Sequence, residues 1–306
     1  MNISKANVLN SALVSAVLFF GIPAIAADQG SQLLFFQAGP GQLAISAGMT
    51  KISSSVDLKI SGASAGDAQF ESSLTHVALE YGLSNALSLE FDTSQGTEET
   101  VINLISPPSQ SIEKYAGMGD LGALAKFNLD SGSMLLRFQA GLNVNNGNKV
   151  APAGSKDGNR SSGGLSVPLI LGVGYKMGST VVGVRASYDN LLERKTDSSG
   201  SISTTTGGNI TTAKAFLEYN SSFLAAAISA GTFTEAESTD KAANGSETVN
   251  KAVTGTVAGI DLGFSLSKNL TLLANYELSA RKYQDGTLDD YTINLATFGG
   301  GIRLMF

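Results

Sequence analysis

The sequence predicts an all-β fold, a transmembrane antiparallel up-and-down β-barrel of about 12 strands, and three observations predict it. An aromatic residue beside a short polar turn recurs at nearly constant spacing, and the stretches between the turns alternate between apolar and polar residues. The chain also begins with a secretory leader and ends in an aromatic residue. Because lipid offers no partners to backbone polar groups, a sheet that crosses a membrane must close on itself.

The repeating unit of the chain is a β-hairpin. Its turn-proximal aromatic residues are Tyr81, Phe127, Tyr175, Tyr219, Phe264 and Phe306, with successive spacings of 46, 48, 44, 45 and 42 residues. Short turns at one end of a barrel, with aromatic rings close to them, are typical of membrane-spanning sheets. The turns place strands at residues 42–60, 71–83, 86–97, 118–129, 133–145, 163–177, 180–194, 209–220, 223–236, 251–267, 270–283 and 290–306.

An even strand count puts both chain ends at the short-turn side, which in a bacterial outer membrane faces the periplasm. The longer connections then face outward, and the longest are expected near residues 93–117, 146–162 and 237–250. Loops of this length often carry function.

The strand expected at residues 133–145 shows the two faces most clearly. Leu136, Phe138, Ala140, Leu142 and Val144 would meet lipid, whereas Arg137, Gln139, Gly141, Asn143 and Asn145 would point into the lumen. The first strand is less regular, because its phase changes between Met49 and Val56. That change predicts a bulge or a later strand start.

Composition excludes several other classes of protein. The chain is 42% hydrophobic, but after residue 26 it has no apolar run near the length of about 20 residues that a spanning helix needs. It has no cysteine, which excludes disulfides, thiolate metal sites and a lipid anchor on cysteine. Its net charge is −6, so a nucleic-acid partner is not expected.

The first 26 residues have the features of a secretory signal peptide. Lys5 precedes an apolar core at residues 12–22, and Ala24-Ile25-Ala26 forms a cleavage motif. A short buried helix or a membrane anchor is the alternative. We therefore divide the chain into a signal peptide (1–26), an N-terminal periplasmic or lumenal segment (27–41) and the barrel (42–306).

The last strand carries a further signal. Phe298, Ile302, Leu304 and Phe306 share one face. This pattern resembles the C-terminal strand of bacterial outer-membrane proteins, whose terminal aromatic residue the barrel-assembly machinery recognises. The resemblance implies a location in the bacterial outer membrane, with contacts to lipid and lipopolysaccharide. A soluble β-sandwich or barrel is the alternative.

A second resemblance covers about residues 75–190. Its motifs are Tyr81-Gly-Leu-Ser-Asn-Ala-Leu-Ser-Leu, Gly117-Met-Gly-Asp-Leu, Ala125-Lys-Phe and Ala140-Gly-Leu. The order of these motifs resembles the meta-pathway phenol degradation transporter-like family, which is distantly related to FadL-type channels for hydrophobic compounds. Where that family has Pro-Thr-Gly, this chain has Val144-Asn-Asn-Gly, so no substrate-binding residue is carried over. The FadL resemblance also implies that the apolar Leu33-Leu34-Phe35-Phe36 stretch enters the lumen as a plug.

The lumen is expected to be nearly balanced in charge, with seven basic and eight acidic residues at inward positions. The lumen-lining candidates are His76, Glu80, Asp120, Lys126, Arg137, Arg185, Glu218, Asp261, Glu277 and Arg303. A mixed lumen favours cross-strand ion pairs that hold the barrel's shape, together with weak ion selectivity.

An enzyme is not expected. His76 is the only histidine, and Ala78 stands where a phospholipase-like His-x-Ser pair would have its nucleophile. No metal or cofactor is expected either, because one histidine and no cysteine make a poor ligand set. The sequence thus favours an outer-membrane channel for passive diffusion of a small solute, with hydrophobic or aromatic compounds as candidates. The alternative is a non-transporting structural, adhesive or surface-recognition barrel that acts through its outer loops.

Overall fold

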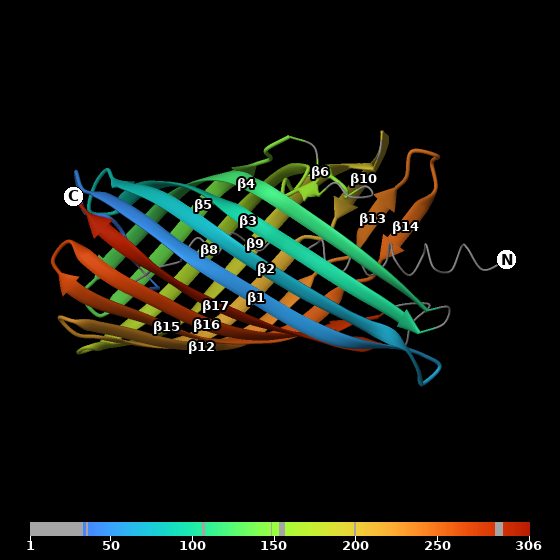
Figure 1. The fold of residues 1–306 in the computed structure, drawn as a ribbon. Helices are drawn as coiled ribbons and strands as arrows, with labels where there is room; N and C mark the ends of the chain where they lie inside the picture. Colours follow the sequence, from blue (N-terminus) through green and yellow to red (C-terminus); the bar gives the residue numbers. More distant parts are fainter. Residues whose placement is uncertain are drawn as a thin grey trace.

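The computed structural model describes residues 33–34, 36–105, 108–147, 149–152, 157–198, 200–284 and 290–306. All regular structure in these residues is β-strand (Figure 1). Across the same ranges, no helix is long and apolar enough to cross a membrane. The expected signal peptide, residues 1–26, lies outside the described residues.

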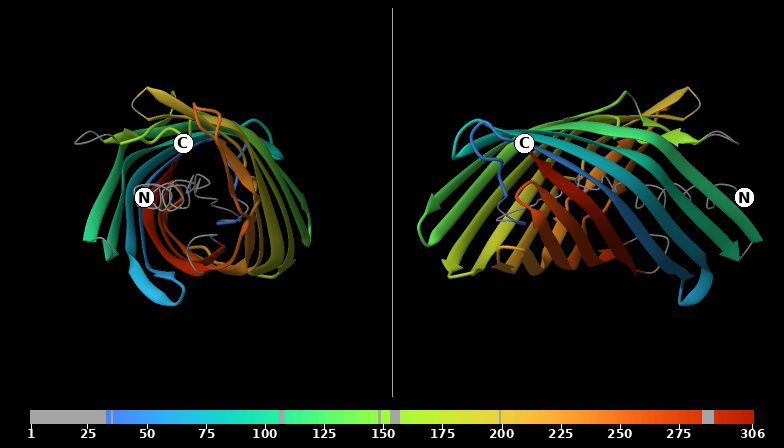
Figure 2. Two further views of the ribbon diagram at one scale, coloured as in Figure 1. Left: turned by 90° about the vertical axis from the view of Figure 1, so that its right-hand side faces the viewer. Right: turned by 60° about the vertical axis from the view of Figure 1, so that its left-hand side comes forward.

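Twelve long strands form a closed antiparallel barrel (Figure 1, Figure 2). They are β1 (Leu43–Ile60), β2 (Ala63–Gly82), β3 (Leu87–Ile105), β4 (Pro108–Ser131), β5 (Met134–Val144), β8 (Gly164–Met177), β9 (Thr180–Ser198), β11 (Ile210–Asn220), β12 (Leu224–Glu235), β15 (Val253–Ser267), β16 (Leu270–Tyr283) and β17 (Tyr291–Met305). Each pairs with the next in this order, and β17 pairs with β1 from Ala44↔Met305 to Ser55↔Asn294. The predicted fold class is confirmed.

Five short strands, which the sequence pattern did not predict, extend the sheet at the outer end. They are β6 (Lys149–Val150), β7 (Gly158–Asn159), β10 (Ser201–Gly207), β13 (Ser238–Lys241) and β14 (Glu247–Asn250). Strands β6 and β7 lie in the connection between β5 and β8 and pair parallel with β9 and β4. Strands β13 and β14 form a hairpin within the connection that was expected near residues 237–250.

Two of the short turns show why the hairpins are tight. Gly132 (φ +65°) and Gly178 (φ +62°) each stand first in a two-residue connection. A glycine at the first central position is what a type II′ hairpin turn requires, and this turn matches the twist of the two strands. Both turns lie at the end of the barrel that also holds Phe306 (Figure 1).

The outer surface of the barrel carries a large apolar band. Its exposed side chains include Met49, Val77, Leu79, Phe91, Leu121, Phe138, Leu142, Leu171, Val184, Ile228, Ile260, Tyr276, Leu278 and Phe298. The turn-proximal rings Tyr81, Phe127, Tyr175, Tyr219, Phe264 and Phe306 are exposed as well. A band of this kind is far larger than the apolar patches of soluble monomers, and it matches the lipid-facing surface of a membrane barrel.

Strands β2, β3 and β4 are longer than the sequence pattern predicted. The region near 93–117, expected to be a loop, is largely strand, because β3 and β4 pair from Leu87↔Phe127 to Ile105↔Pro108. The outward side chains of β2 become polar beyond Val77, at Thr75, Ser73 and Glu71. The apolar-out alternation therefore stops where these strands leave the lipid, although their backbone pairing continues.

The apparent phase change in the first strand also has a different cause from the one expected. The pairing of β1 with β2 runs without a shift from Leu43↔Tyr81 to Leu58↔Gly66. Met49 points outward, whereas Ile52 and Leu58 are buried inside the barrel. The strand therefore has no bulge between Met49 and Val56, because its apolar residues simply move from the lipid face to the lumen face.

Candidate functional site

The lumen of the barrel holds three zones, which follow one another along the strands from the short-turn end. The first is a buried charge cluster that binds the N-terminal segment. The second is a cavity with charged and apolar walls. The third is an apolar inner wall near the outer end, beside a connection that folds inward.

The charge cluster is centred on Lys126 of β4. Its Nζ lies 2.9 Å from Glu80 Oε2 and 2.5 Å from Glu90 Oε2, and all three side chains are buried. Ser88 Oγ also donates to Glu80 at 2.6 Å. Because β2, β3 and β4 are neighbours, their alternation brings these inward residues together, and the pairing satisfies charges that burial would otherwise penalise.

The N-terminal segment lies inside the ring of strands, as the blue chain in the end-on view of Figure 2 shows. The backbone N–H groups of Leu33 and Leu34 both donate to the Glu218 carboxylate, at 3.2 Å each. Glu218 has no exposed surface. Farther along, the N–H of Ala38 donates to Glu80 at 3.0 Å. Two carboxylates of the barrel wall therefore hold the segment by its backbone.

Two arginines also hold this segment, Arg137 through backbone carbonyls and Arg303 through an aromatic ring. Arg137 donates to the carbonyl of Leu34 at 2.8 Å and to that of Phe36 at 2.5 Å, while its Nε donates to Asn128 at 2.8 Å. The Arg303 guanidinium stacks 3.7 Å from the centre of the Phe36 ring. Arg137 is only 1% exposed, so its surroundings, and not bulk water, satisfy its donors.

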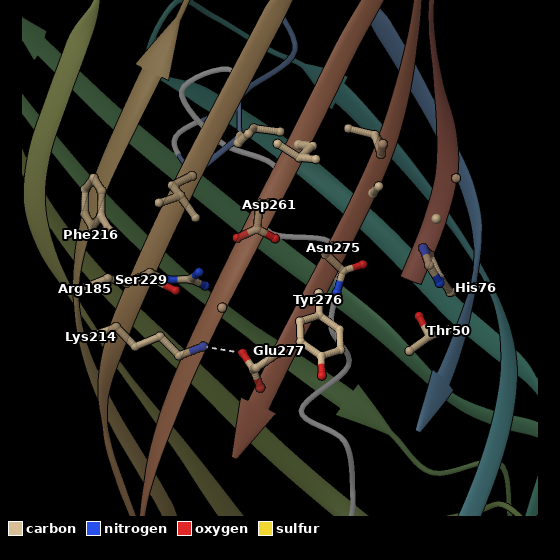
Figure 3. Close-up of a pocket in the computed structure, with 18 of the residues that line it drawn as sticks. Thr50, His76, Arg185, Lys214, Phe216, Ser229, Asp261, Asn275, Tyr276 and Glu277 are labelled. Carbon is tan, nitrogen blue, oxygen red and sulfur yellow. Dashed lines mark hydrogen bonds and ion pairs between the residues drawn. The ribbon is translucent and has the colours of Figure 1, made fainter. Parts of the chain in front are cut away.

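A cavity of about 130 Å³ lies beside this segment (Figure 3). Leu33, Leu34, Phe216 and Leu273 form an apolar wall, and the first three are buried with Leu135, Val181, Ala225 and Ala227 in one cluster. The polar lining side chains are Thr50, His76, Arg185, Lys214, Ser229, Asp261, Asn275 and Glu277. The cavity is therefore apolar on one side and polar on the other.

The charges of the cavity are arranged by strand. Arg185 and Lys214 come from the adjacent strands β9 and β11, and Asp261 and Glu277 come from the adjacent strands β15 and β16. Lys214 Nζ reaches Glu277 Oε2 at 2.6 Å across the intervening strands (Figure 3). Two basic and two acidic groups leave this wall without net charge.

The inner wall becomes apolar toward the outer end. Ile52, Phe70, Phe233, Val253, Tyr283, Ile293 and Leu295 form one buried cluster, with Val56 and Tyr291 against it. The rings of Tyr283 and Tyr291 stack at 5.2 Å, and the Arg281 guanidinium lies 4.7 Å from the centre of the Phe233 ring. These residues belong to neighbouring strands, so they form a continuous apolar lining on one side of the mouth.

The connection between β5 and β8 folds over the same mouth. Arg160 donates to Glu98 at 3.0 Å, and Asp120 accepts the backbone N–H groups of Asn146 and Ser162 at 3.2 and 3.1 Å. Lys149 lies 5.2 Å from the centre of the Tyr115 ring. These contacts tie the connection to β3 and β4, and its strands β6 and β7 continue the sheet beside β9 and β4.

The structure separates the predicted site residues into three groups. The residues that surround the N-terminal segment are Glu80, Lys126, Arg137, Glu218 and Arg303. The residues that line the cavity are His76, Arg185, Asp261 and Glu277. Asp120 anchors the connection between β5 and β8. Charge and alternation alone identified them. Phe306, the predicted assembly signal, is exposed at the seam, where its backbone pairs with Leu43.

The selection of candidates by charge left out several residues that shape the lumen. Phe216, Leu273 and Asn275 line the cavity, and Arg160 fixes the outer connection. Phe216, Leu273 and Asn275 stand at inward positions of the alternation, but they carry no charge that would single them out as candidates. Arg160 lies in a loop, where no periodicity assigns a direction.

The described residues contain no group of three or more His, Asp or Glu side chains placed to hold a metal ion. The lining of the cavity presents hydrogen-bonding groups, charges and an apolar surface.

No family model matches the chain, and no curated protein matches it in sequence. Solved structures resemble its fold. The COG4313 outer membrane channel from Pseudomonas putida F1 is 13% identical at a TM-score of 0.63, covering 89% of this chain and 98% of that one. The transport unit of the autotransporter AIDA-I from Escherichia coli (12% identity, TM-score 0.56) and the translocator domain of NalP from Neisseria meningitidis (14%, 0.51) each cover 97% of this chain, and the chain covers 98% and 97% of them. These likenesses support the barrel fold.

Proposed function

We propose that this protein is a bacterial outer-membrane channel through which a small solute diffuses passively. The observation that carries the proposal is the cavity inside the barrel, which is about 130 Å³ in size and lined by both apolar and polar side chains. Paired charges in the lumen can also hold the shape of the barrel, so the proposal rests on the cavity with its mixed lining and not on the charges alone.

Hydrophobic or aromatic solutes are the favoured class. The apolar lining formed by the cluster around Phe233 and Tyr283 stands between the mouth and the cavity, so a solute with an apolar face would meet a compatible surface along its path. The resemblance to the meta-pathway transporter-like family points to the same class. The Pseudomonas putida barrel of similar fold is named an outer membrane channel, which supports the channel role.

The outer-membrane location is part of this proposal. The apolar band, the rings beside the short turns and the terminal Phe306 support contacts with outer-membrane lipid, lipopolysaccharide and the barrel-assembly machinery. An enzymatic role is not proposed.

Planar-bilayer recordings of the purified mature protein test the proposal. We expect stepwise currents with a reversal potential close to zero under a salt gradient, because the lumen charges nearly balance. Liposomes that contain the protein should also take up small solutes faster than empty liposomes. A sealed barrel, with neither current nor uptake, would favour the alternative role in surface recognition through the outer connections.

A further inference from the structure

The side chains that line the cavity beside Leu33 and Leu34 indicate which kind of solute fits there. We infer that it binds an uncharged solute the size of a single ring that carries one hydrogen-bonding head group; this inference rests on the proposed channel function. Three properties of the cavity favour such a solute: its size, the placement of its apolar and polar walls, and its balance of charges.

The size of the cavity suits a solute of about one ring. The cavity measures about 130 Å³. An apolar cavity of about 150 Å³ engineered in another protein holds one benzene molecule, so this cavity has room for a ring of about that size.

The two walls orient the solute. Leu33, Leu34, Phe216 and Leu273 form one end, where a ring can be buried without facing unpaired polar groups. Asn275 lies at the other end with Thr50 and His76 (Figure 3). A head group that donates and accepts hydrogen bonds would satisfy these side chains, whereas a plain hydrocarbon would displace their water without replacing its hydrogen bonds.

The charge balance disfavours a charged head. Arg185 and Lys214 are matched by Asp261 and Glu277, and Lys214 already contacts Glu277 at 2.6 Å. A carboxylate or ammonium entering this site would lose its hydration and would meet no excess of opposite charge, or it would have to break the existing pair. An uncharged head avoids both costs.

Four probes of nearly one shape separate these possibilities: benzyl alcohol, benzoate, benzylammonium and toluene. Each is titrated calorimetrically at pH 7 into the mature protein in lipid nanodiscs, with empty nanodiscs as the blank. We expect benzyl alcohol to bind about tenfold more tightly than the other three. A site built for an uncharged hydrogen-bonding group rejects analogues that lack this group or carry a charge in its place. Equal affinities, or tightest binding of any other probe, would overturn the inference.

A cavity-filling variant ties the binding to this place. Gly259 faces the cavity, and a Cβ there would lie 3.4 Å from the Tyr276 carbonyl oxygen and 3.5 Å from Ser229 Oγ, which is ordinary contact. Gly259→Leu should weaken benzyl alcohol binding about tenfold by occupying the space of the ring. Ala258→Leu adds the same bulk to the exposed face of the same strand and should leave binding unchanged. Equal effects of the two variants would place the binding elsewhere.

A charge variant gives a second readout that does not depend on Gly259→Leu folding. Lys214→Met leaves Asp261 and Glu277 opposed by Arg185 alone, so benzylammonium should gain about tenfold over benzoate relative to the wild type. No change in this ratio would count against the cavity as the binding place. Bilayer currents separate the two proposals: a conducting protein without probe preference refutes the solute class alone, whereas a selective protein that never conducts refutes the channel.

Discussion

Arg137 is a lumen residue whose contacts are mainly with the N-terminal segment. Its guanidinium reaches two backbone carbonyls of the N-terminal segment and the side chain of Asn128, while Glu80 and Glu218 accept backbone N–H groups of the same segment. The sequence suggested that such charges form cross-strand ion pairs that hold the barrel's shape. In the structure, Arg137 is covered by the segment, so its first effect is on the position of that segment.

Arg137→Met should therefore destabilise the barrel and release the segment. Two buried carbonyls lose their donors and nearby carboxylates lose a counter-charge, so we expect the free energy of unfolding to fall by about 3 kcal/mol in urea titrations of lipid-reconstituted protein. Chymotrypsin should then cut near Leu33, Leu34 and Phe36. Arg137→Lys keeps the charge, so its stability should lie between those of the wild type and Arg137→Met. Unchanged stability and unchanged protection from chymotrypsin in Arg137→Met would show that Arg137 does not hold the segment.

Lys149 gives the outer connection a pH dependence. Burial lowers the pKa of Lys149 to about 8, against 10.5 for the free side chain. The folded state therefore loses this proton before the unfolded state does, so this residue's contribution to stability increases as pH rises from about 8 toward 10.5 and is constant below that window. Urea titrations at a series of pH values should show that the free energy of unfolding rises with pH more steeply in the wild type than in Lys149→Met between about pH 8 and 10.5, and equally in both proteins below pH 8. The same pH dependence in both proteins throughout would exclude the effect.

At the scale of elements, the N-terminal segment lies inside the barrel near its short-turn end. It contributes Leu33 and Leu34 to the cavity wall and places Phe36 against Arg303. The long outer parts of β2, β3 and β4 and the connection that holds Arg160 shape the opposite end.

Removal of residues 27–41 should raise the single-channel conductance, because it empties the short-turn end of the lumen. A matched variant replaces the same residues with an equally long Gly/Ser stretch, which keeps the length and removes the apolar side chains that fill the cluster around Phe216. We expect both variants to conduct more than wild type in planar bilayers. Conductance that stays at the wild-type value in both would show that the segment does not limit flow.

At the scale of the whole molecule, the barrel depends on one seam. Strands β1 and β17 come from opposite ends of the chain, and the backbones of Leu43 and Phe306 pair at 3.1 and 2.9 Å at its short-turn edge. Closure there leaves no sheet edge exposed to lipid.

Deletion of Phe306 should lower the amount of assembled barrel without changing synthesis. In the wild type, we expect the protein in the outer-membrane fraction to run as a compact band on a cold gel and to shift on boiling. The deletion should reduce that compact band, whereas Phe306→Tyr keeps an aromatic ring and should retain it. A soluble periplasmic protein without a heat-dependent shift would contradict the membrane assignment.

The sequence by itself determined the number of spanning strands, the short turns and, where the alternation is regular, the inward or outward face of a side chain. These features depend on local periodicity: a residue such as Arg137 faces the lumen because Leu136 and Phe138 on either side of it face lipid. The alternation fails in the outer parts of β2 to β4, where both faces meet water or protein and pairing continues without an apolar-out pattern.

Only the tertiary structure decided which inward residues meet. Glu218 lies 184 residues from Leu34 along the chain, and Lys214 reaches Glu277 across two strands. Alternation assigns a side chain to the lumen but says nothing about its partner there, because strand tilt, barrel closure and the entry of the N-terminal segment set those distances. The cavity follows from the same long-range packing, so its lining could be established only from the closed barrel.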